Sequence, residues 1–535
     1  MRVTDFEYVT EFDGFPDRKV LLIGMMEDGP VGRAFTMNTR EKVNIFLGEN
    51  EVTDAYHRLL DTGVPADNIL FYRLNGDTSQ AILNTKEGTP AIEFRTLTAN
   101  NADNNIEIVV SEQGLSVLSN YSEETLIQSK RKNFSRSYLF EDYPTTADLA
   151  DAFTNDAMLG LTNVIASPLL YLESRDAFLE SDVSVFYDGN TEESLVHRHG
   201  DFPDNYHEQY WESFYKTILN DGLNDVRESI LLEYPVEVYY FVDYPFSGSE
   251  DSKNILKLAA SIAEEKTVEQ ILHTTALFRT APIPEKRLLF ENEYLLPDGT
   301  FFNEETQEIE EYDPDRQTLS FILEIANSFT EEEREDSFMR NLQVVVGEDS
   351  LAGGLTPAST DYLALLLTEN IHSPITNKPL ANFNQVRTPL SKYMIDTLQS
   401  KGYICSVPSI RKNVVVTKGQ SMYTETNNIM DSFYHMKLIK TMGRDIGLLV
   451  DRYIGKPKSS YLESNIQNEI QDYLSFYLET SALSDYKVEL INDGYSPNES
   501  GIHISLSFYG EIHTIETTIQ MSDEGWAIDL WNINN

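Results

Sequence analysis

Four side chains with metal-binding chemistry cluster in one short stretch of the chain. His197 and His199 are separated by a single residue, and His207 and Glu208 follow nearby. Imidazole and carboxylate groups are ligands that zinc and manganese take from proteins. The stretch is polar and irregular, however, and it lacks the apolar shell that orients metal ligands. We favour a solvated loop here and keep a metal site as the alternative.

A second candidate for chemistry is the glycine-containing segment Gly347–Gly354, which follows a predicted strand. Its backbone could cradle an anion, but Glu348 and Asp349 would repel a phosphate. The chain has neither a GxxxxGKS or GxxxxGKT loop nor a GxGxxG turn after any predicted strand. It also lacks the GxSxG pattern of a nucleophilic serine. These patterns predict no catalytic residues, no cofactor and no enzyme activity.

Charge excludes two large classes of partner. The 535-residue chain has 87 acidic and 41 basic residues, and its formal net charge is -46 at pH 7. Such a chain is repelled by nucleic-acid phosphates and by anionic membrane surfaces. No apolar run approaches the length of a membrane span, so membrane insertion is not expected. The hydrophobic fraction of 41% suits packed globular domains, and the length predicts about three or four of them.

An α/β core in two separate parts is predicted from the apolar runs. The first part covers residues 19–80, and strand–helix–strand order there predicts at least one parallel strand pair. Its elements are the strand Lys19–Gly24, the helices Thr39–Leu47 and Glu51–Asp61, and the strand Asn68–Arg73. The second part covers residues 341–455 and opens on the buried strand Leu342–Gly347.

Between these parts lie a β-rich insertion and an acidic region. Residues 81–167 alternate in polarity over several short runs, which predicts an inserted β-rich domain. Residues 168–340 are acidic and irregular, with one strong aromatic strand at 236–242. In the second core part, Val414–Thr417 and Gln420–Thr424 flank a Lys-Gly pair and are predicted to form a hairpin.

The last hundred residues predict a small unit with open sheet edges. A helix-period run at Lys437–Ile454 is followed by a second amphipathic run that ends near Tyr477. Three alternating strands are then predicted at Tyr486–Leu490, Ile502–Phe508 and Ile512–Ile519. Two helices and three strands bury little core, and open edges are templates for pairing with another chain. The aromatic end Trp526–Trp531 would be a liability if it stayed in water.

The order of these motifs resembles that of contractile tail sheath proteins of phages and related injection systems. The chain departs from the family's pattern at Asn101–Asn104, where the family usually has glycine. The segments that carry the resemblance are Val20–Gly24 with Gly29-Pro30, Phe46–Gly48, Gly63 with Asn68–Arg73, Thr96–Val110, Asp148–Ala166, Leu390–Cys405, Val414–Thr417 and Lys437–Ile454.

The resemblance implies an α/β and α+β multidomain fold. It has a sheath-like α/β core, an inserted β-rich domain and a small two-helix, three-strand C-terminal module. The expected divisions are a 1–18 N-terminal arm, a core at 19–80 and 341–455, an insertion at 81–167, the acidic variable region 168–340, a 456–521 C-terminal module and a 522–535 C-terminal arm.

The implied function is mechanical. A tail sheath subunit of a bacteriophage virion assembles in the host cytoplasm into stacked hexameric rings around a tail tube, and the sheath contracts during genome ejection. Expected partners are other copies of the chain, the tail tube protein, and baseplate and neck or collar proteins. Two alternatives stay open: a collar, tail-terminator or baseplate ring protein on the same fold, and an acidic cytosolic α/β metalloenzyme with its site near residues 197–208.

The family's terminal arms add strands to a neighbour's C-terminal sheet, which is β-strand augmentation. Here Arg2–Phe12 would be one arm, and Glu511–Met521 with Trp526–Trp531 the other. The residues expected at the contact between subunits are Val3, Phe6, Tyr8, Val488, Leu490, Ile502, Ile504, Leu506, Phe508, Ile512, Ile515, Ile519, Trp526 and Trp531.

Overall fold

A computed structural model describes most of the chain. The described residues are 7–8, 18–26, 28–30, 34–37, 39–74, 79–98, 106–121, 132–173, 184–185, 236–270, 274–281, 283, 293–295, 301–303, 307–310, 314–349, 356–370, 373–409, 413–424, 432–453, 456–457, 459–491, 501–509, 516–522 and 525–531. The statements below concern these residues.

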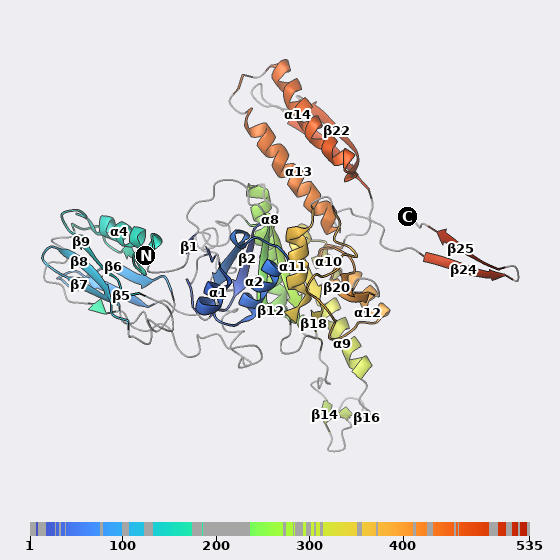
Figure 1. The fold of residues 1–535 in the computed structure, drawn as a ribbon, viewed down its shortest axis with the longest axis horizontal. Helices are drawn as coiled ribbons and strands as arrows, with labels where there is room; N and C mark the ends of the chain where they lie inside the picture. The colour runs from blue at the N-terminus through green and yellow to red at the C-terminus, as the bar shows by residue number, and fades with distance from the viewer. Residues whose placement is uncertain are drawn as a thin grey trace.

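A nine-stranded sheet lies at the centre of the molecule, in the order β1-β3-β4-β2-β12-β13-β17-β20-β21 (Figure 1). The six strands from β4 to β20 run parallel, and the pairings outside them are antiparallel. Their bounds are β1 Glu7–Tyr8, β2 Val20–Gly24, β3 Ala34–Thr36, β4 Ile69–Arg73, β12 Val238–Phe246, β13 Thr275–Thr280, β17 Leu342–Val346, β20 Ile404–Ser409 and β21 Asn413–Val416.

Helices cover both faces of this sheet, which explains why its parallel strands are largely apolar. Every residue of β2, β4, β13 and β17 is buried. Along β12, Val238, Tyr240 and Val242 enter one core while Tyr239 and Phe241 enter the other. The first core contains α1 (Arg40–Leu47), α2 (Glu51–Asp61) and α11 (Ala358–Thr368), and the second contains α8 (Glu250–Gln270), α9 (Pro314–Asn327) and α12 (Lys392–Gln399).

The sheet takes two of its central strands from residues 168–340. The sequence places only one strand at 236–242 in that region, whereas the structure has β12 and β13 there, joined through α8. The strong aromatic run predicts β12 correctly, but its neighbours in the sheet come from segments far away in the chain. The domain divisions themselves stay predictions.

The hairpin predicted at Val414–Thr417 and Gln420–Thr424 is wrong. Residues 413–416 form β21, which pairs antiparallel with the preceding strand β20. The Gln420 side chain instead donates through Nε2 to the carbonyls of Gln399 and Tyr403, at 2.9 Å each. The side-chain pattern of a strand does not identify its partner strand. Here β21 pairs with the open edge of β20 and not with Gln420–Thr424.

Residues 80–185 form two smaller sheets, β10-β6-β5 and β11-β7-β8-β9, beside the central sheet (Figure 1). The helix α4 (Thr146–Met158) packs with both sheets in one apolar core, and Thr145 and Asp148 close its N-terminus with a capping box. The strands are β5 Gln80–Asn84, β6 Pro90–Thr96, β7 Ile106–Val110, β8 Gly114–Ser119, β9 Ser135–Leu139, β10 Val164–Pro168 and β11 Ser184–Val185.

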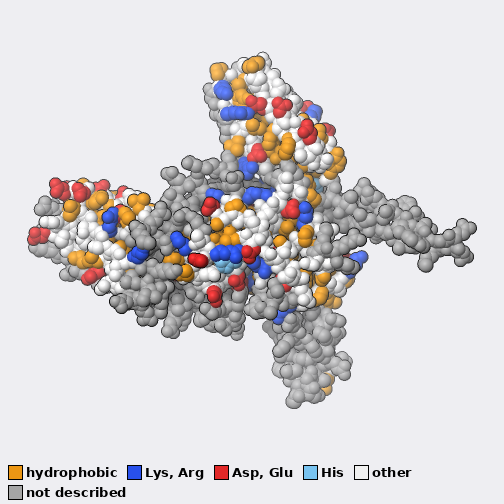
Figure 2. Space-filling view, viewed as in Figure 1, with side chains coloured by type: hydrophobic (Ala, Val, Ile, Leu, Met, Phe, Trp, Pro, Cys, Tyr) orange, Lys and Arg blue, Asp and Glu red, His pale blue; other side chains and the backbone are white. Residues whose placement is uncertain are grey.

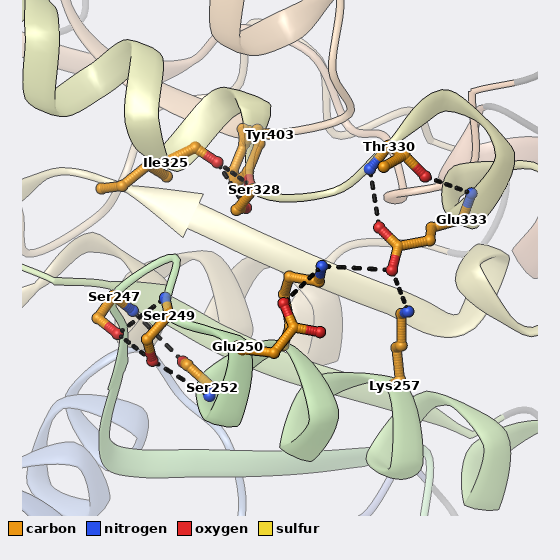
Figure 3. Close-up of polar contacts among 11 residues, drawn as sticks. Ser247, Ser249, Glu250, Ser252, Lys257, Ile325, Ser328, Thr330, Glu333 and Tyr403 are labelled. Carbon is orange, nitrogen blue, oxygen red and sulfur yellow. Dashed lines mark hydrogen bonds and ion pairs between the residues drawn. The ribbon is translucent and has the colours of Figure 1, made fainter.

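Figure 3 shows a polar joint between α8 and the short helix α10 (Glu331–Arg334). The Glu333 carboxylate accepts from the ammonium group of Lys257 and from the Thr330 backbone N–H at 2.8 Å. The Lys253 ammonium group lies 3.3 Å from the same carboxylate. Burial would raise the pKa of Glu333, but the three donors outweigh it and lower that pKa to about 2.

The C-terminal unit rises from one end of the central sheet (Figure 1). It consists of α13 (Phe433–Asp451), α14 (Ser460–Glu479), β22 (Leu483–Ile491) and β23 (Gly501–Phe508). A separate hairpin of β24 (Glu516–Ser522) and β25 (Gly525–Trp531) follows. Short elements elsewhere are the sheet β14-β15-β16 (Glu293–Leu295, Phe301–Asn303, Glu308–Glu310) and the ribbon β18-β19 (Glu348–Asp349, Thr356–Pro357).

The structure differs here from the predicted three-strand module. Residues 516–519 of the third predicted strand, Ile512–Ile519, pair with β25 and not with β23. Polarity alternation identifies a strand but not its partner, and a nearby strand costs less loop-closure entropy than a distant one. The chain therefore has two two-stranded C-terminal sheets where one larger sheet was expected.

Candidate assembly surface

One face of the β22–β23 sheet packs on the two C-terminal helices. Leu438 and Met442 of α13, Leu474 of α14, and Leu483 and Val488 of β22 all belong to one buried cluster. This cluster shares no residue with the two cores of the central sheet. The alternation of apolar and polar residues in both strands produces this one-sided packing. The C-terminal unit therefore has a small core of its own.

The opposite face of the same sheet is polar and exposed. Side chains that point there come from alternate positions of both strands, as a half-buried antiparallel pair requires. They are Asp485, Lys487 and Glu489 of β22 and His503, Ser505 and Ser507 of β23. Within the described part of the chain, nothing forms a second layer over this face.

Burial is unequal between the two strands. Val488 on β22 is only 5% exposed, whereas the four apolar side chains of β23 are only partly buried. Those four are Ile502, Ile504, Leu506 and Phe508. Among the described residues, β23 has a strand neighbour on one side only. A further strand beside β23 would cover apolar surface that its own helices leave partly open.

Side-chain hydrogen bonds hold the sheet in position on the helices. Gln467 of α14 donates through Nε2 to the Val488 carbonyl at 2.8 Å, and the Tyr486 hydroxyl donates to the Gln471 carbonyl at 3.1 Å. At the end of β23, the His435 ring nitrogen Nε2 lies 3.0 Å from the Tyr509 carbonyl oxygen. The first two bonds hold β22 on α14, and the third holds the end of β23 on α13.

A polar cluster also joins the two helices of the unit. The Tyr473 hydroxyl donates to the Asp445 carboxylate at 2.8 Å and lies 2.9 Å from the Tyr477 hydroxyl. Burial raises the pKa of Tyr477, so this hydroxyl stays protonated across the physiological range. This polar cluster holds α13 against α14, the two helices on which the β22–β23 sheet packs.

The β24–β25 hairpin is the second open sheet. Seven residue pairs run from Glu516 opposite Trp531 to Ser522 opposite Gly525. It extends away from the other described elements in Figure 1. A lone two-stranded hairpin is marginally stable in water, and three or more strands or a packed helix are needed for independent stability. Among the described residues, this hairpin therefore has neither the third strand nor the packed helix that would complete it.

Of the predicted N-terminal arm, residues 1–18, the structure describes Glu7 and Tyr8 of β1 and also Arg18. Glu7 pairs with Thr36 and Tyr8 with Phe35, both on β3 of the same chain. This two-residue strand lies at the edge of the central sheet, where it pairs on one side only. Val3 and Phe6 lie outside the described residues.

The structure brings only part of the predicted contact set together. Val488, Ile502, Ile504, Leu506 and Phe508 share the helix-facing side of one sheet, packed in their own chain. Leu490 continues β22, while Ile519, Trp526 and Trp531 lie in the separate hairpin, all described at the level of backbone. Ile512 and Ile515 lie outside the described residues, as do the alternative metal ligands His197, His199, His207 and Glu208.

Sequence reasoning missed three charged residues that hold the C-terminal unit on the core: Arg18, Glu237 and Lys437. They are more than 180 positions apart in the chain, and no local motif marks them. The only available signal was Lys437, a cation at the start of a helix whose neighbours are apolar.

The surface of the unit carries hydrophobic side chains among charged ones, and Figure 2 shows this mixture over α13 and α14. Leu448 is 42% exposed, Tyr461 76% and Phe476 52%. None of the described helices is both long and apolar enough to cross a membrane. Three or more metal-ligating side chains do not come together anywhere in the described ranges.

The described chain is thus a mixed α/β protein of several sheets, and its two C-terminal sheets have unpaired edges. No protein-family model and no curated protein matches it. Among solved structures it is similar to a sheath tail protein from Desulfitobacterium hafniense, at 11% identity and a TM-score of 0.40, over 94% of this chain and 100% of that chain. A sheath tail protein from Listeria innocua has 13% identity and a TM-score of 0.42, over 93% and 96%.

A third similar structure is the helical sheath of the anti-feeding prophage in its contracted state. It has 11% identity and a TM-score of 0.38, over 62% of this chain and 77% of that one. Two of these three solved structures are thus sheath tail proteins, and the third is a helical sheath.

Proposed function

We propose that this chain is a tail sheath subunit of a bacteriophage virion. It assembles in the host cytoplasm into stacked hexameric rings around a tail tube, and contraction of the sheath drives genome ejection. The chain acts through assembly and not through catalysis. The observation that carries the proposal is the pair of incomplete C-terminal sheets, each with backbone edges that no described residue pairs.

The contact is β-strand augmentation. Backbone hydrogen bonds along a sheet edge provide affinity, and alternate side chains set the register. The β23 edge is the receiving edge, because its apolar side chains are only partly buried while Val488 of β22 is fully packed. The donors are the segment Arg2–Phe12 and the β24–β25 hairpin of neighbouring copies.

The same edges suit a collar, tail-terminator or baseplate ring protein. Such a ring would engage the edges on one side and present a closed surface on the other. Baseplate, neck or collar proteins and the tube protein are the further partners of either role. No observation in the described residues favours the metalloenzyme alternative near residues 197–208.

The proposal is tested by removing the donors and leaving the receiver intact. Full chain, a variant lacking residues 1–12 and a variant lacking residues 516–535 are purified and imaged by electron microscopy. The full chain is expected to form rings or tubes. Each truncation is expected to reduce the number of rings and tubes at least tenfold, while the far-UV circular dichroism spectrum remains that of the folded full chain.

The matched control replaces residues 1–12 by the same residues in scrambled order, which keeps length and charge. This control is expected to assemble as poorly as the deletion, because register depends on residue order. Assembly of both truncated chains at the level of the full chain would refute augmentation. A small uniform particle that copurifies with a metal would favour the metalloenzyme.

A further inference from the structure

The C-terminal end of α11 is capped by two cations from opposite ends of the chain. Arg18 donates through Nη1 to the Leu367 carbonyl at 3.0 Å and also to the Glu369 carbonyl. Lys437, in the second turn of α13, donates through Nζ to the Leu366 carbonyl at 3.0 Å. The last carbonyls of a helix have no partner within the helix, and cations are favourable there.

Both cations also reach one carboxylate. Lys437 Nζ lies 3.2 Å from Oε1 of Glu237, and Arg18 Nε lies 3.7 Å from Oε2 of the same residue. The Glu237 side chain is 11% exposed and that of Lys437 8%. A buried charge is costly unless it is paired, so Lys437 and Glu237 depend on each other, while Arg18, 29% exposed, adds a second cation to the same carboxylate.

The three residues stand at structural junctions. Arg18 is where the N-terminal arm joins β2, and Lys437 is where α13 leaves the central sheet for the C-terminal unit. Glu237 directly precedes β12, and its backbone N–H donates to the Lys19 carbonyl at 2.8 Å. Burial lowers the pKa of Lys437, and the nearby Glu237 charge opposes part of that shift.

We propose that Glu237 is a shared anchor that fastens two roots to the central sheet: the end of the N-terminal arm at Arg18 and the start of α13 at Lys437. The charge cluster consists of Arg18, Glu237 and Lys437. If a neighbouring copy displaces one root, Glu237 loses one of its two cations, and the other root is held less firmly. Displacement of the N-terminal arm therefore loosens α13, and displacement of α13 loosens the arm. The role of this coupling in a ring rests on the proposed function, but the anchor itself lies within one chain.

The test is amide hydrogen exchange on the full-length chain under conditions where it is monomeric. Glu237→Gln removes the charge and keeps the shape of the side chain. We expect exchange at least fivefold faster in two peptides at once, one spanning residues 13–20 and one spanning residues 433–442. Protection of α2 is expected to stay unchanged, because α2 does not contact the anchor.

Glu369→Gln is the matched control. The Glu369 carboxylate pairs with Lys378 at 3.2 Å, so this variant removes a nearby charge and leaves the anchor carboxylate in place. It is expected to speed exchange in both peptides clearly less than Glu237→Gln does, because the Glu369 charge acts on Lys437 without an ion pair to it. Faster exchange in only one of the two peptides with Glu237→Gln, or equal effects of the two variants, would overturn the shared anchor.

If Glu237→Gln loses α2 protection as well, Arg18→Met and Lys437→Met provide the same test. Each keeps the aliphatic stem and removes one cation. The shared anchor predicts that each substitution speeds exchange at the other root too. Exchange that speeds up only at the substituted root contradicts it. Because the measurement uses monomeric chain, its result is independent of whether rings form.

Discussion

Single carboxylates at the joints between elements hold this molecule together more than its many surface charges do. Most of the 87 acidic residues can be solvated individually, and exposed ion pairs contribute little to stability. Glu333 and Glu237 differ because each is largely buried and each meets two cations from other elements. Stability at the residue scale should therefore depend on a few named carboxylates.

Glu333→Gln is expected to lower the free energy of unfolding by about 1–2 kcal/mol, since it weakens charge-assisted hydrogen bonds. The pKa of Glu333 is depressed to about 2 in the folded chain. Its stabilisation is thus present above the unfolded pKa near 4.5 and is lost as pH falls towards 2. Urea unfolding at pH 7 and at pH 3 measures this.

Glu332→Gln, exposed on the same turn, is the control and should change stability by less than about 0.5 kcal/mol. The difference in free energy of unfolding between Glu333→Gln and Glu332→Gln should be smaller at pH 3, because the Glu333 carboxylate of the unmodified chain contributes less stability there. A gap of equal size at both pH values would show that charge is not what Glu333 supplies.

At the scale of elements, the C-terminal unit and the central sheet are separate packing units joined by one helix. Phe433 of α13 packs in a core of the central sheet, and Tyr434, Leu438 and Met442 pack in the C-terminal cluster. A helix shared in this way transmits displacement from one unit to the other. Loss of packing in the C-terminal cluster should nevertheless stay local.

Leu474→Ala tests this separation. Leu474 is fully buried in the C-terminal cluster, and such truncations cost about 2–5 kcal/mol. Hydrogen exchange in α14 and β22 should become faster while α2 keeps its protection. Leu478→Ala, at a 41% exposed position of the same helix, should change neither. Equal loss of protection in α2 and α14 after Leu474→Ala would mean that the two units unfold together.

At the scale of the whole molecule, net charge opposes assembly. Copies that each carry a formal charge of -46 repel one another, and this repulsion is screened over about 10 Å at 0.1 M salt. Assembly followed by light scattering should therefore be faster at about 0.5 M than at about 0.05 M sodium chloride. Sodium acetate at equal ionic strength is the control for anion effects. Slower assembly at high salt would show that attractive ion pairs dominate the contact.

Much of the central sheet was predictable because of its burial. Strands predicted at Lys19–Gly24, Asn68–Arg73 and Leu342–Gly347 are β2, β4 and β17, within one residue at each end. Strands buried on both faces are continuous apolar runs, which sequence shows directly. The strand Ile502–Phe508 was equally clear, because alternation over its seven residues indicates a half-buried strand.

Pairing and charge contacts were not predictable in the same way. Residues 516–519 were expected beside β23, but they pair with β25. Val414–Val416 were expected to pair with the following segment, Gln420–Thr424, but they pair with the preceding strand β20. Strands pair through backbone N–H and C=O groups that nearly every residue has, so the side-chain pattern of a strand does not identify its partner strand.

The sequence alone determined several of the strands, among them β2, β4, β17 and β23, and the two helices of the C-terminal unit. These are consequences of side-chain periodicity along a local backbone geometry. Only the tertiary structure decided that β12 and β13 lie in the centre of the sheet and that Arg18, Glu237 and Lys437 meet. The physical reason is distance along the chain: contacts over hundreds of residues depend on how whole elements pack, and no local pattern records that.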